Sequence, residues 1–229
     1  MMSDSAVRTT PRGSKSPPRP RSRALLLALI VIGVLAAGYY AFGALGLLGG
    51  SRTAATPGER RALGPADARV QIVVYFDFQC PHCDSLHSGA EAQIVETYVK
   101  TNKARLEVRP LAFMGPDSVR AAEAALCAAD QGHFWDYRDE LFSSFRQNSR
   151  TAYSQDGLLR VASRVGLDTN AFGTCLSQHQ RRAEVDELLR QGQADGVQVV
   201  PTVLVDGQKL EGALPFGSFA AIIERSLAR

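Results

Sequence analysis

Two cysteines that could carry redox chemistry, Cys80 and Cys83, are separated by two residues in the sequence Cys-Pro-His-Cys. Pro81 suits the first position of a helix, where its missing N–H costs nothing, so we expect Cys80 at a helix N-terminus. There the unpaired backbone N–H groups and the helix dipole favour the thiolate over the thiol, and His82 can donate a hydrogen bond or a positive charge to it. A stabilised Cys80 thiolate favours the reduced pair, so a Cys80–Cys83 disulfide is expected to be a ready oxidant, attacked at Cys80.

Two other uses of this cysteine pair stay open from the residues alone. The pair could form a purely structural disulfide, although a tight ring at the start of a helix is an unusual place for one. It could also belong to a zinc site, for which His82, His87, Cys175 and His179 are candidate further ligands. The sequence lacks the compact second Cys-x-x-Cys or His pair of a zinc module, so we predict no metal site.

The elements that must position the pair follow from the apolar pattern. Residues 69–78, RVQIVVYFDF, form a β-branched and aromatic run that predicts a buried strand ending just before Cys80. Apolar residues recur at helical spacing after Pro81, which predicts a helix there. Similar runs, turn signals and helical spacings predict the remaining elements. These are strands at 105–113, 199–205 and 209–212, the last two joined by a turn at Asp206-Gly207, helices over about 115–196, and a closing helix at 215–227.

Several side chains within this framework have competing interpretations. Asp77 could act as a proton relay or as a local charge near Cys83. A group of large apolar residues in the expected helices could form a surface for unfolded proteins or a membrane partner, but we favour a place in the core. The members of this group are Phe134, Trp135, Leu141, Phe142 and Phe145. We expect the histidines His87, His133 and His179 to be solvated or capping residues rather than catalytic ones.

The N-terminal segment predicts a membrane anchor. Residues 24–48 contain no charged side chain and are long enough to cross a bilayer with some tilt. Residues 1–23 carry six basic residues against Asp4 alone, so the positive-inside rule places them in the cytoplasm and everything after Leu48 outside. The alternative is a secretory signal peptide that is cleaved within the apolar run, where Val34-Leu35-Ala36 is an acceptable cleavage site.

The rest of the chain is organised around this span. Residues 1–23 are rich in Ser, Pro and Arg and predict a disordered tail, and residues 49–66 predict a flexible linker. Residues 67–229 then form one folded domain, which is long enough to bury its own core.

The composition is that of a globular protein, with 45% apolar and 21% charged residues. The formal net charge of +3 comes from residues 1–23, which carry +5. The remaining residues hold 20 basic and 22 acidic side chains, so the folded part is mildly acidic. We therefore predict no nucleic-acid binding.

All four cysteines follow the predicted span, in a compartment that permits disulfides. Cys127 and Cys175 fall on two different predicted helices, 48 residues apart. A structural bridge between them is the preferred interpretation, and it would stabilise the fold through loop closure. Free buried thiols and a second redox relay are the alternatives.

Three separated motifs give the chain a family resemblance. The runs YFDFQCPHC, CAADQGHFWDYRDELF and VVPTVLVDGQKLEG, in that order, resemble the DsbA-type thiol:disulfide oxidoreductases. The resemblance covers about 160 residues, essentially the whole predicted domain. It implies an α/β, thioredoxin-like fold with a helical insertion domain at about 115–196, here preceded by one N-terminal transmembrane helix.

The resemblance also assigns roles to individual residues. It implies that Cys80 is the attacking cysteine and Cys83 its buried partner, with Pro81 and His82 as the dipeptide that accompanies strong oxidants. Pro201 resembles the family's cis-proline, which faces the active site. A cis-Pro201 would expose the backbone of Val200, so that an extended substrate peptide could add as a short strand.

These expectations combine into a thiol:disulfide oxidoreductase that donates the Cys80–Cys83 disulfide to reduced or unfolded exported proteins. The resemblance implies reoxidation by a quinone-linked membrane protein of the DsbB or vitamin K epoxide reductase-like type. The domain is expected on the outer side of the cell membrane, held by a single-pass anchor, and no cofactor motif occurs in the sequence. The alternatives are a reductase or isomerase with the same fold, and a membrane-anchored binding module with a structural disulfide.

Overall fold

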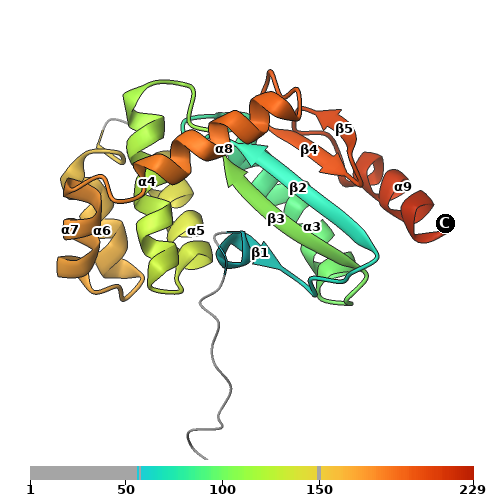
Figure 1. Cartoon of the computed structure of the whole chain (residues 1–229), viewed down its shortest axis with the longest axis horizontal. Helices are drawn as coiled ribbons and strands as arrows, with labels where there is room; N and C mark the ends of the chain where they lie inside the picture. The colour runs from blue at the N-terminus through green and yellow to red at the C-terminus, as the bar shows by residue number, and fades with distance from the viewer. Residues whose placement is uncertain (1–55, 57, 149–150) are drawn as a thin grey trace, which may run out of the picture. The chain divides into compact units, whose positions relative to one another are not determined.

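A five-stranded mixed sheet forms the centre of the described part of the chain, which comprises residues 56, 58–148 and 151–229 of a computed structural model (Figure 1). The strands lie in the order β1-β3-β2-β4-β5. Strands β2 and β3 are parallel, whereas β1, β4 and β5 are antiparallel to the strands beside them. Their bounds are β1 Ala62–Leu63, β2 Val70–Phe76, β3 Ala104–Pro110, β4 Thr202–Val205 and β5 Gln208–Glu211.

The predicted hairpin is confirmed as β4 and β5. Its two-residue turn places Asp206 at φ 47° and Gly207 at φ 81°, the left-handed values that favour Asp and Gly in tight hairpins. The Asp206 carboxylate also accepts a 2.8 Å hydrogen bond from the backbone N–H of Gln71 at the start of β2. The turn therefore fixes the register of β4 against the strand that leads to the cysteine pair.

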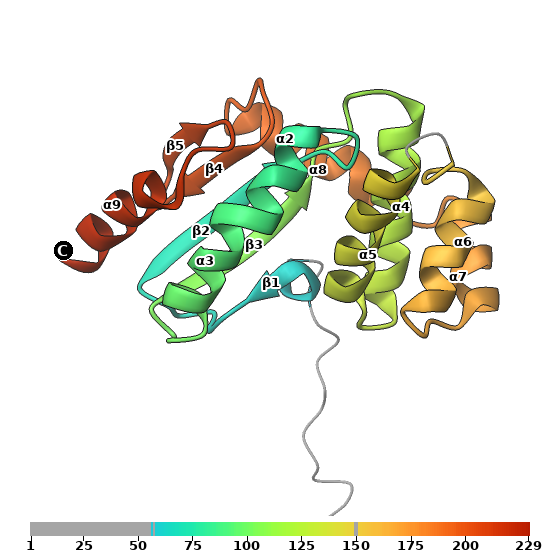
Figure 2. The ribbon, with the colours of Figure 1, turned by 180° about the vertical axis from the view of Figure 1, so that it is seen from behind.

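Helices cover both faces of the sheet (Figures 1 and 2). One face carries α9 and a continuous helical run that contains two π-helical segments, and the other face carries α8. Strand β2 contributes side chains to the packing on both faces of the sheet. Ile72 and Val74 pack on the face that carries α9, and Tyr75 packs on the face that carries α8. The run comprises α2 Pro81–Leu86, η2 His87–Glu91, α3 Ala92–Ile94 and η3 Val95–Val99, while α8 is Arg182–Ala194 and α9 is Phe216–Leu227.

The predicted helical insertion is confirmed between β3 and β4. Four of its helices pack against one another beside the sheet (Figure 1). Phe134, Leu141 and Phe142 are buried there, and Trp135 and Phe145 pack against the same core, so the core interpretation of this apolar group is confirmed. The four helices are α4 Pro116–Asp130, α5 Phe134–Gln147, α6 Gln155–Arg164 and α7 Thr169–Ser177.

The predicted linker at 49–66 is wrong over its last residues. A short 3₁₀ helix, η1 at Glu59–Arg61, and strand β1 fold onto the edge of the sheet, where Leu63 pairs with Leu106. The Arg61 side chain is buried, and its Nη1 donates a 2.8 Å hydrogen bond to the carbonyl of Val108. Such short elements depend on distant partners and leave no periodic pattern, so the folded domain begins earlier than its local sequence indicates.

The described residues contain no helix that is both long and apolar enough to cross a membrane. The predicted tail at 1–23, the predicted span at 24–48 and the first part of the predicted linker lie outside the described residues.

Candidate active site

Cys80 and Cys83 lie where β2 gives way to a helix, at the end of the sheet marked by α2 in Figure 2. Cys80 is the N-cap residue of α2, and Pro81 is the first residue of the helix. The backbone N–H groups of Cys83 and Asp84 donate hydrogen bonds of 3.0 and 3.3 Å to the carbonyl of Cys80, which closes the first turn. Both thiols are free and almost fully buried, whereas His82 is exposed on the same turn.

The surroundings of Cys83 hold it as a thiol. Burial raises the pKa of Cys83 far above its usual range, and the backbone N–H of Asp77, 3.5 Å from the Cys83 Sγ, opposes this only in part. Charge at Cys80 and Asp77 raises the pKa of Cys83 further. Cys83 is therefore a poor nucleophile while it remains buried, because the thiolate is the reactive form.

Cys80 faces the loop that precedes β4. Its Sγ donates a 3.6 Å hydrogen bond to the carbonyl oxygen of Val200, and the Val200–Pro201 peptide bond is cis. The Thr202 hydroxyl donates to the carbonyl of Val199 at 2.7 Å, which secures the loop from its other side. The structure thus brings Cys80, Cys83, Val200 and Pro201 together, with a backbone carbonyl directed at the sulfur.

Asp77 lies beside Cys83, as its interpretation as a local charge expected, and it also has a structural role that the sequence did not indicate. Its buried carboxylate accepts hydrogen bonds from the Gln79 N–H at 2.8 Å, the Ser118 hydroxyl at 2.7 Å and the N–H groups of Phe113 and Met114 at 3.2 Å each. These donors come from the turn before Cys80, from the start of α4 and from the loop between β3 and α4. Asp77 therefore joins the cysteine turn to the insertion. An acidic residue inside an apolar strand is the signal, because a buried carboxylate requires several donors.

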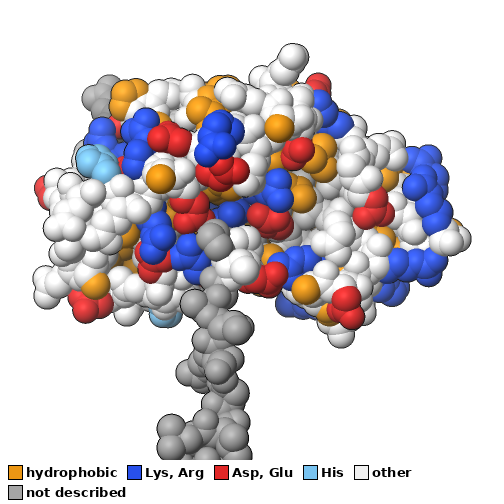
Figure 3. Space-filling model, viewed as in Figure 1, with side chains coloured by type: hydrophobic (Ala, Val, Ile, Leu, Met, Phe, Trp, Pro, Cys, Tyr) orange, Lys and Arg blue, Asp and Glu red, His pale blue; other side chains and the backbone are white. Residues whose placement is uncertain are grey.

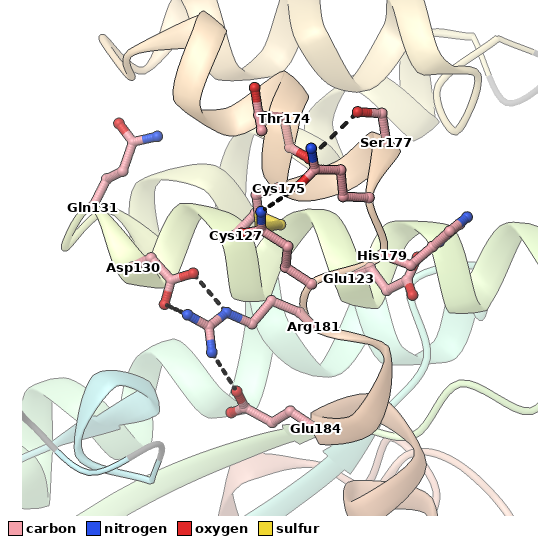
Figure 4. The surroundings of a disulfide bond; sticks show 12 residues. Glu123, Cys127, Asp130, Gln131, Thr174, Cys175, Ser177, His179, Arg181 and Glu184 are labelled. Atoms are coloured by element: carbon pink, nitrogen blue, oxygen red, sulfur yellow. Dashed lines mark hydrogen bonds and ion pairs between the residues drawn. A yellow bond between two sulfur atoms is a disulfide. The ribbon is translucent and has the colours of Figure 1, made fainter.

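The second cysteine pair forms a disulfide between α4 and α7 (Figure 4). The Cys127 and Cys175 sulfurs are 1.97 Å apart, and both residues are buried. One helical turn away from each cysteine, Glu123 Oε2 lies 3.0 Å from His179 Nδ1 and links the same two segments. The bond leaves no free thiol at these positions, and it holds α4 to α7.

The structure also shows the surroundings of the histidines and of the candidate zinc ligands. His87 is mostly buried between Glu91 and Asp139, so the expectation of a solvated residue is wrong for it. His133 occupies the N-cap position of α5, as expected. Cys175 is bonded to another sulfur and so is not a zinc ligand. Across the described residues, no three His, Cys, Asp or Glu side chains gather as a metal site would require.

Comparison with known proteins places this geometry in a family. Residues 56–225 match the family model described as Thioredoxin. The chain is 30% identical over 174 residues to Na(+)/H(+) antiporter NhaA 3 of Salinispora tropica, covering 75% of this chain and 25% of that protein. It is 28% identical over 152 residues to the Bacillus anthracis protein named "Probable disulfide bond formation protein D", covering 65% of this chain and 70% of that one. The chain thus spans about a quarter of the length of the first curated relatives it matches.

Solved structures share the fold. Oxidised BdbD from Bacillus subtilis aligns with a TM-score of 0.69 at 21% identity, covering 74% of this chain and 93% of that one. DsbA from Chlamydia trachomatis aligns with a TM-score of 0.62 at 20% identity, covering 72% and 90%. The matched region contains the sheet, the cysteine turn, the cis-proline loop and the insertion together. The fold, with its helical insertion, is thus similar to that of oxidised BdbD and of DsbA, and the family-model match shows that the chain belongs to the thioredoxin family.

Proposed function

We propose that this chain oxidises the thiols of reduced exported proteins by donating a Cys80–Cys83 disulfide to them. The observation that carries the proposal is the position of Cys80, which begins a helix and faces the carbonyl of Val200 beside cis-Pro201 while Cys83 lies buried behind it. Of the two sulfurs, the one of Cys80 is the less buried and lies beside the cis-proline loop, so it is the proposed point of attack. The antiporter name of some relatives is not transferred, because this chain matches only a quarter of each of those proteins.

The reaction is two successive thiol–disulfide exchanges. A client thiolate attacks Cys80 Sγ, a bond forms between the two sulfurs, and the Cys80–Cys83 bond breaks. The Cys83 sulfur leaves as a thiolate and takes up a proton. A second client thiolate then attacks the client sulfur of the mixed disulfide, and Cys80 leaves as a thiolate. The client loses two electrons and the enzyme gains them, ending as the dithiol.

The burial of Cys83 favours this direction of electron flow. A Cys83 thiol with a raised pKa attacks the mixed disulfide slowly, so the client's own second cysteine has time to complete the exchange. Val200 supports substrate binding, because an extended client beside it can pair with its backbone as a short strand and bring its cysteine to Cys80. Backbone pairing of this kind suits an enzyme that accepts many different sequences.

The proposed setting is the outer side of the cell membrane. Residues 24–48 are proposed as a single-pass anchor with residues 1–23 on the cytoplasmic side, and the domain after residue 48 is proposed to be extracytoplasmic. The Cys127–Cys175 disulfide supports this setting, since disulfides persist in oxidising compartments. Turnover requires that the dithiol be reoxidised, and we propose a quinone-linked membrane protein as the acceptor of its two electrons.

The test is an equilibrium and a trapping experiment. The Cys80–Cys83 pair is equilibrated with reduced and oxidised glutathione, and we expect a pair far more oxidising than thioredoxin. A potential near that of thioredoxin would instead indicate a reductase, and a pair that glutathione cannot reduce would indicate a structural disulfide. In parallel, Cys83→Ala supplied with oxidised glutathione as the electron acceptor should accumulate mixed disulfides with client proteins at Cys80, and the matched Cys80→Ala variant should not. No trapped species with Cys83→Ala would contradict the mechanism.

A further inference from the structure

Glu123 is a buried carboxylate with one unused oxygen. It lies on α4 and is 1% exposed. Its Oε2 lies 3.0 Å from His179 Nδ1, while its Oε1 has no hydrogen-bond partner within the part of the chain that the structure describes. Figure 4 shows Glu123 and His179 near the disulfide. Buried carboxylate oxygens are normally satisfied, so an open acceptor at this depth points to a donor that arrives from outside.

Glu123 is one of the residues that line a cavity of about 440 Å³. Apolar residues form one wall, on the loop between β3 and α4 and on the first turns of α4, and charged residues form the rim. Figure 3 shows Lys and Arg side chains beside acidic and hydrophobic ones over α4 and α8. The residues that shape the cavity are Phe113, Pro116, Val119, Arg120, His179 and Arg182.

The charges around the cavity leave the Glu123 carboxylate without a full counter-charge. Arg120 is paired with Asp117 at 3.1 Å, and Arg182 is paired with Asp186 at 3.0 Å, so both rim cations already have acidic partners. His179 contacts only the Oε2 atom of Glu123, so Oε1 is left without a hydrogen-bond donor among the described residues. The cavity therefore has apolar walls and a negative floor. That combination fits a long aliphatic stem with a cationic, hydrogen-bond-donating head, as in lysine or arginine.

Phe113 lies between the cavity and the cysteine site. Phe113 also lines a second cavity of about 160 Å³, together with Val197 and Gln198, which lead along the chain to Val199 and Val200. Phe113, Met114 and Val199 are exposed at 46%, 47% and 45%, and they are the large hydrophobic residues that stand exposed among those described. The backbone N–H groups of Phe113 and Met114 donate hydrogen bonds to the carboxylate of Asp77, which precedes Cys80 by three positions in the sequence. Exposed apolar residues therefore lie on the loop between the turn that carries Cys80 and the cavity that Glu123 lines.

We propose that this cavity is a second binding site for the client polypeptide, which takes a lysine or arginine side chain on one side of the client's reactive cysteine. The proposal rests on the proposed function, because the occupant is the client whose cysteine attacks Cys80. Its stem packs against Phe113 and Val119, and its head donates to Glu123 Oε1. Clients with a basic residue at the matching distance from a cysteine are then oxidised faster than other clients.

The test uses the oxidised full chain and a series of short peptides that each contain a Cys-x-x-Cys pair. A single lysine is moved along the peptide one position at a time, and norleucine and acetyl-lysine replace it in matched peptides. Single-turnover reduction of the protein is followed by quenching, alkylation and mass spectrometry. At one position we expect lysine to react about tenfold faster than norleucine, the gain from one hydrogen bond to a charged group, and acetyl-lysine to lose this advantage.

Variants localise the effect. Glu123→Gln should bring the lysine-to-norleucine rate ratio close to one. Glu184→Gln is the matched control, since Glu184 also has a buried oxygen without a partner but lines a different cavity, and it should keep the ratio. No favoured position for lysine, or a preference that survives both acetylation and Glu123→Gln, would overturn the proposal. Failure of the proposed function is separate, because then neither lysine nor norleucine peptides would reduce the protein.

Discussion

Removing Arg138 should destabilise the domain strongly, because it would leave a buried carboxylate without its partner. Arg138 on α5 is 1% exposed, and its Nη2 donates to both Glu91 carboxylate oxygens, at 2.7 and 2.8 Å. The guanidinium also lies over the ring of Phe76, 4.9 Å from its centroid. Glu91 belongs to the helical run that begins at Cys80, so this ion pair joins the thioredoxin-like core to the insertion.

The expected loss follows from which contacts Arg138→Met keeps. Methionine retains most of the apolar packing on Phe76, so the loss comes mainly from the stranded charge of Glu91. Breaking a buried pair on one side costs about 3–5 kcal/mol. His87 Nδ1 lies 3.5 Å from Glu91 Oε1 and compensates in part, so we expect about 3 kcal/mol at neutral pH. Replacing both partners, in Glu91→Leu/Arg138→Met, should recover most of this loss, since a well-packed apolar pair is often as stable as a buried ion pair.

Urea unfolding of the chain, followed by far-UV circular dichroism, measures these free energies. The pH dependence adds a second check. In the wild type, burial raises the pKa of Glu91, but Arg138 and His87 outweigh burial and the pKa is lowered overall, so the contribution of Glu91 is lost as the pH falls through that value. In Arg138→Met the largest lowering influence is gone, and acidification relieves the stranded charge. The difference in the free energy of unfolding between the wild type and Arg138→Met should therefore become smaller at low pH. A loss below about 1 kcal/mol at neutral pH, or a double variant as unstable as the single one, would refute the reasoning.

Two further predictions concern stability. Cys127→Ala/Cys175→Ala opens a loop of 48 residues, for which chain entropy predicts a loss of about 4 kcal/mol in the free energy of unfolding, and an unchanged urea midpoint would contradict this. Burial lowers the pKa of His87, but hydrogen bonds to Asp139 and Glu91 outweigh it, so the pKa is raised overall. The contribution of protonated His87 to stability is complete below the pKa of histidine in the unfolded chain, about 6.5, and is lost as the pH rises through the pKa of His87 in the folded protein. The free energy of unfolding that His87→Gln loses relative to the wild type should therefore be largest in mild acid and become smaller as the pH rises. A loss that does not change with pH in urea unfolding would contradict a raised pKa of His87.

The parts of the fold that the sequence predicts are those fixed by near neighbours along the chain. The strand before Cys80, the helix that begins at Pro81 and the Asp206-Gly207 hairpin each follow from residues within a few positions. The cysteine pair is local for the same reason, since only two residues separate Cys80 from Cys83. The cis conformation of Pro201 is different, because only the family resemblance indicated it.

The parts that the sequence missed depend on partners far along the chain. Strand β1 pairs with β3 across more than 40 residues, so its two residues carry no pattern of their own. The four donors to Asp77 come partly from 36 to 41 residues away, and Arg138 finds Glu91 across 47. A charged side chain in the sequence suggests a solvated surface by default. Only the assembled fold shows that these charges are buried and paired.

The two cysteine pairs of this chain differ in state, since Cys80 and Cys83 are free thiols and Cys127 and Cys175 form a disulfide. Their positions in the fold are consistent with this difference. Cys80 and Cys83 lie three residues apart at a helix start, so closing their disulfide removes little freedom from the chain and opening it costs the fold little. Cys127 and Cys175 join two helices across 48 residues, so opening their bond releases a long loop. Cys80 also faces a loop with exposed apolar residues, while the second pair is buried between α4 and α7. The proposed function therefore uses the short-loop pair, beside the cis-proline loop, for exchange and leaves the long-loop pair to hold two helices together.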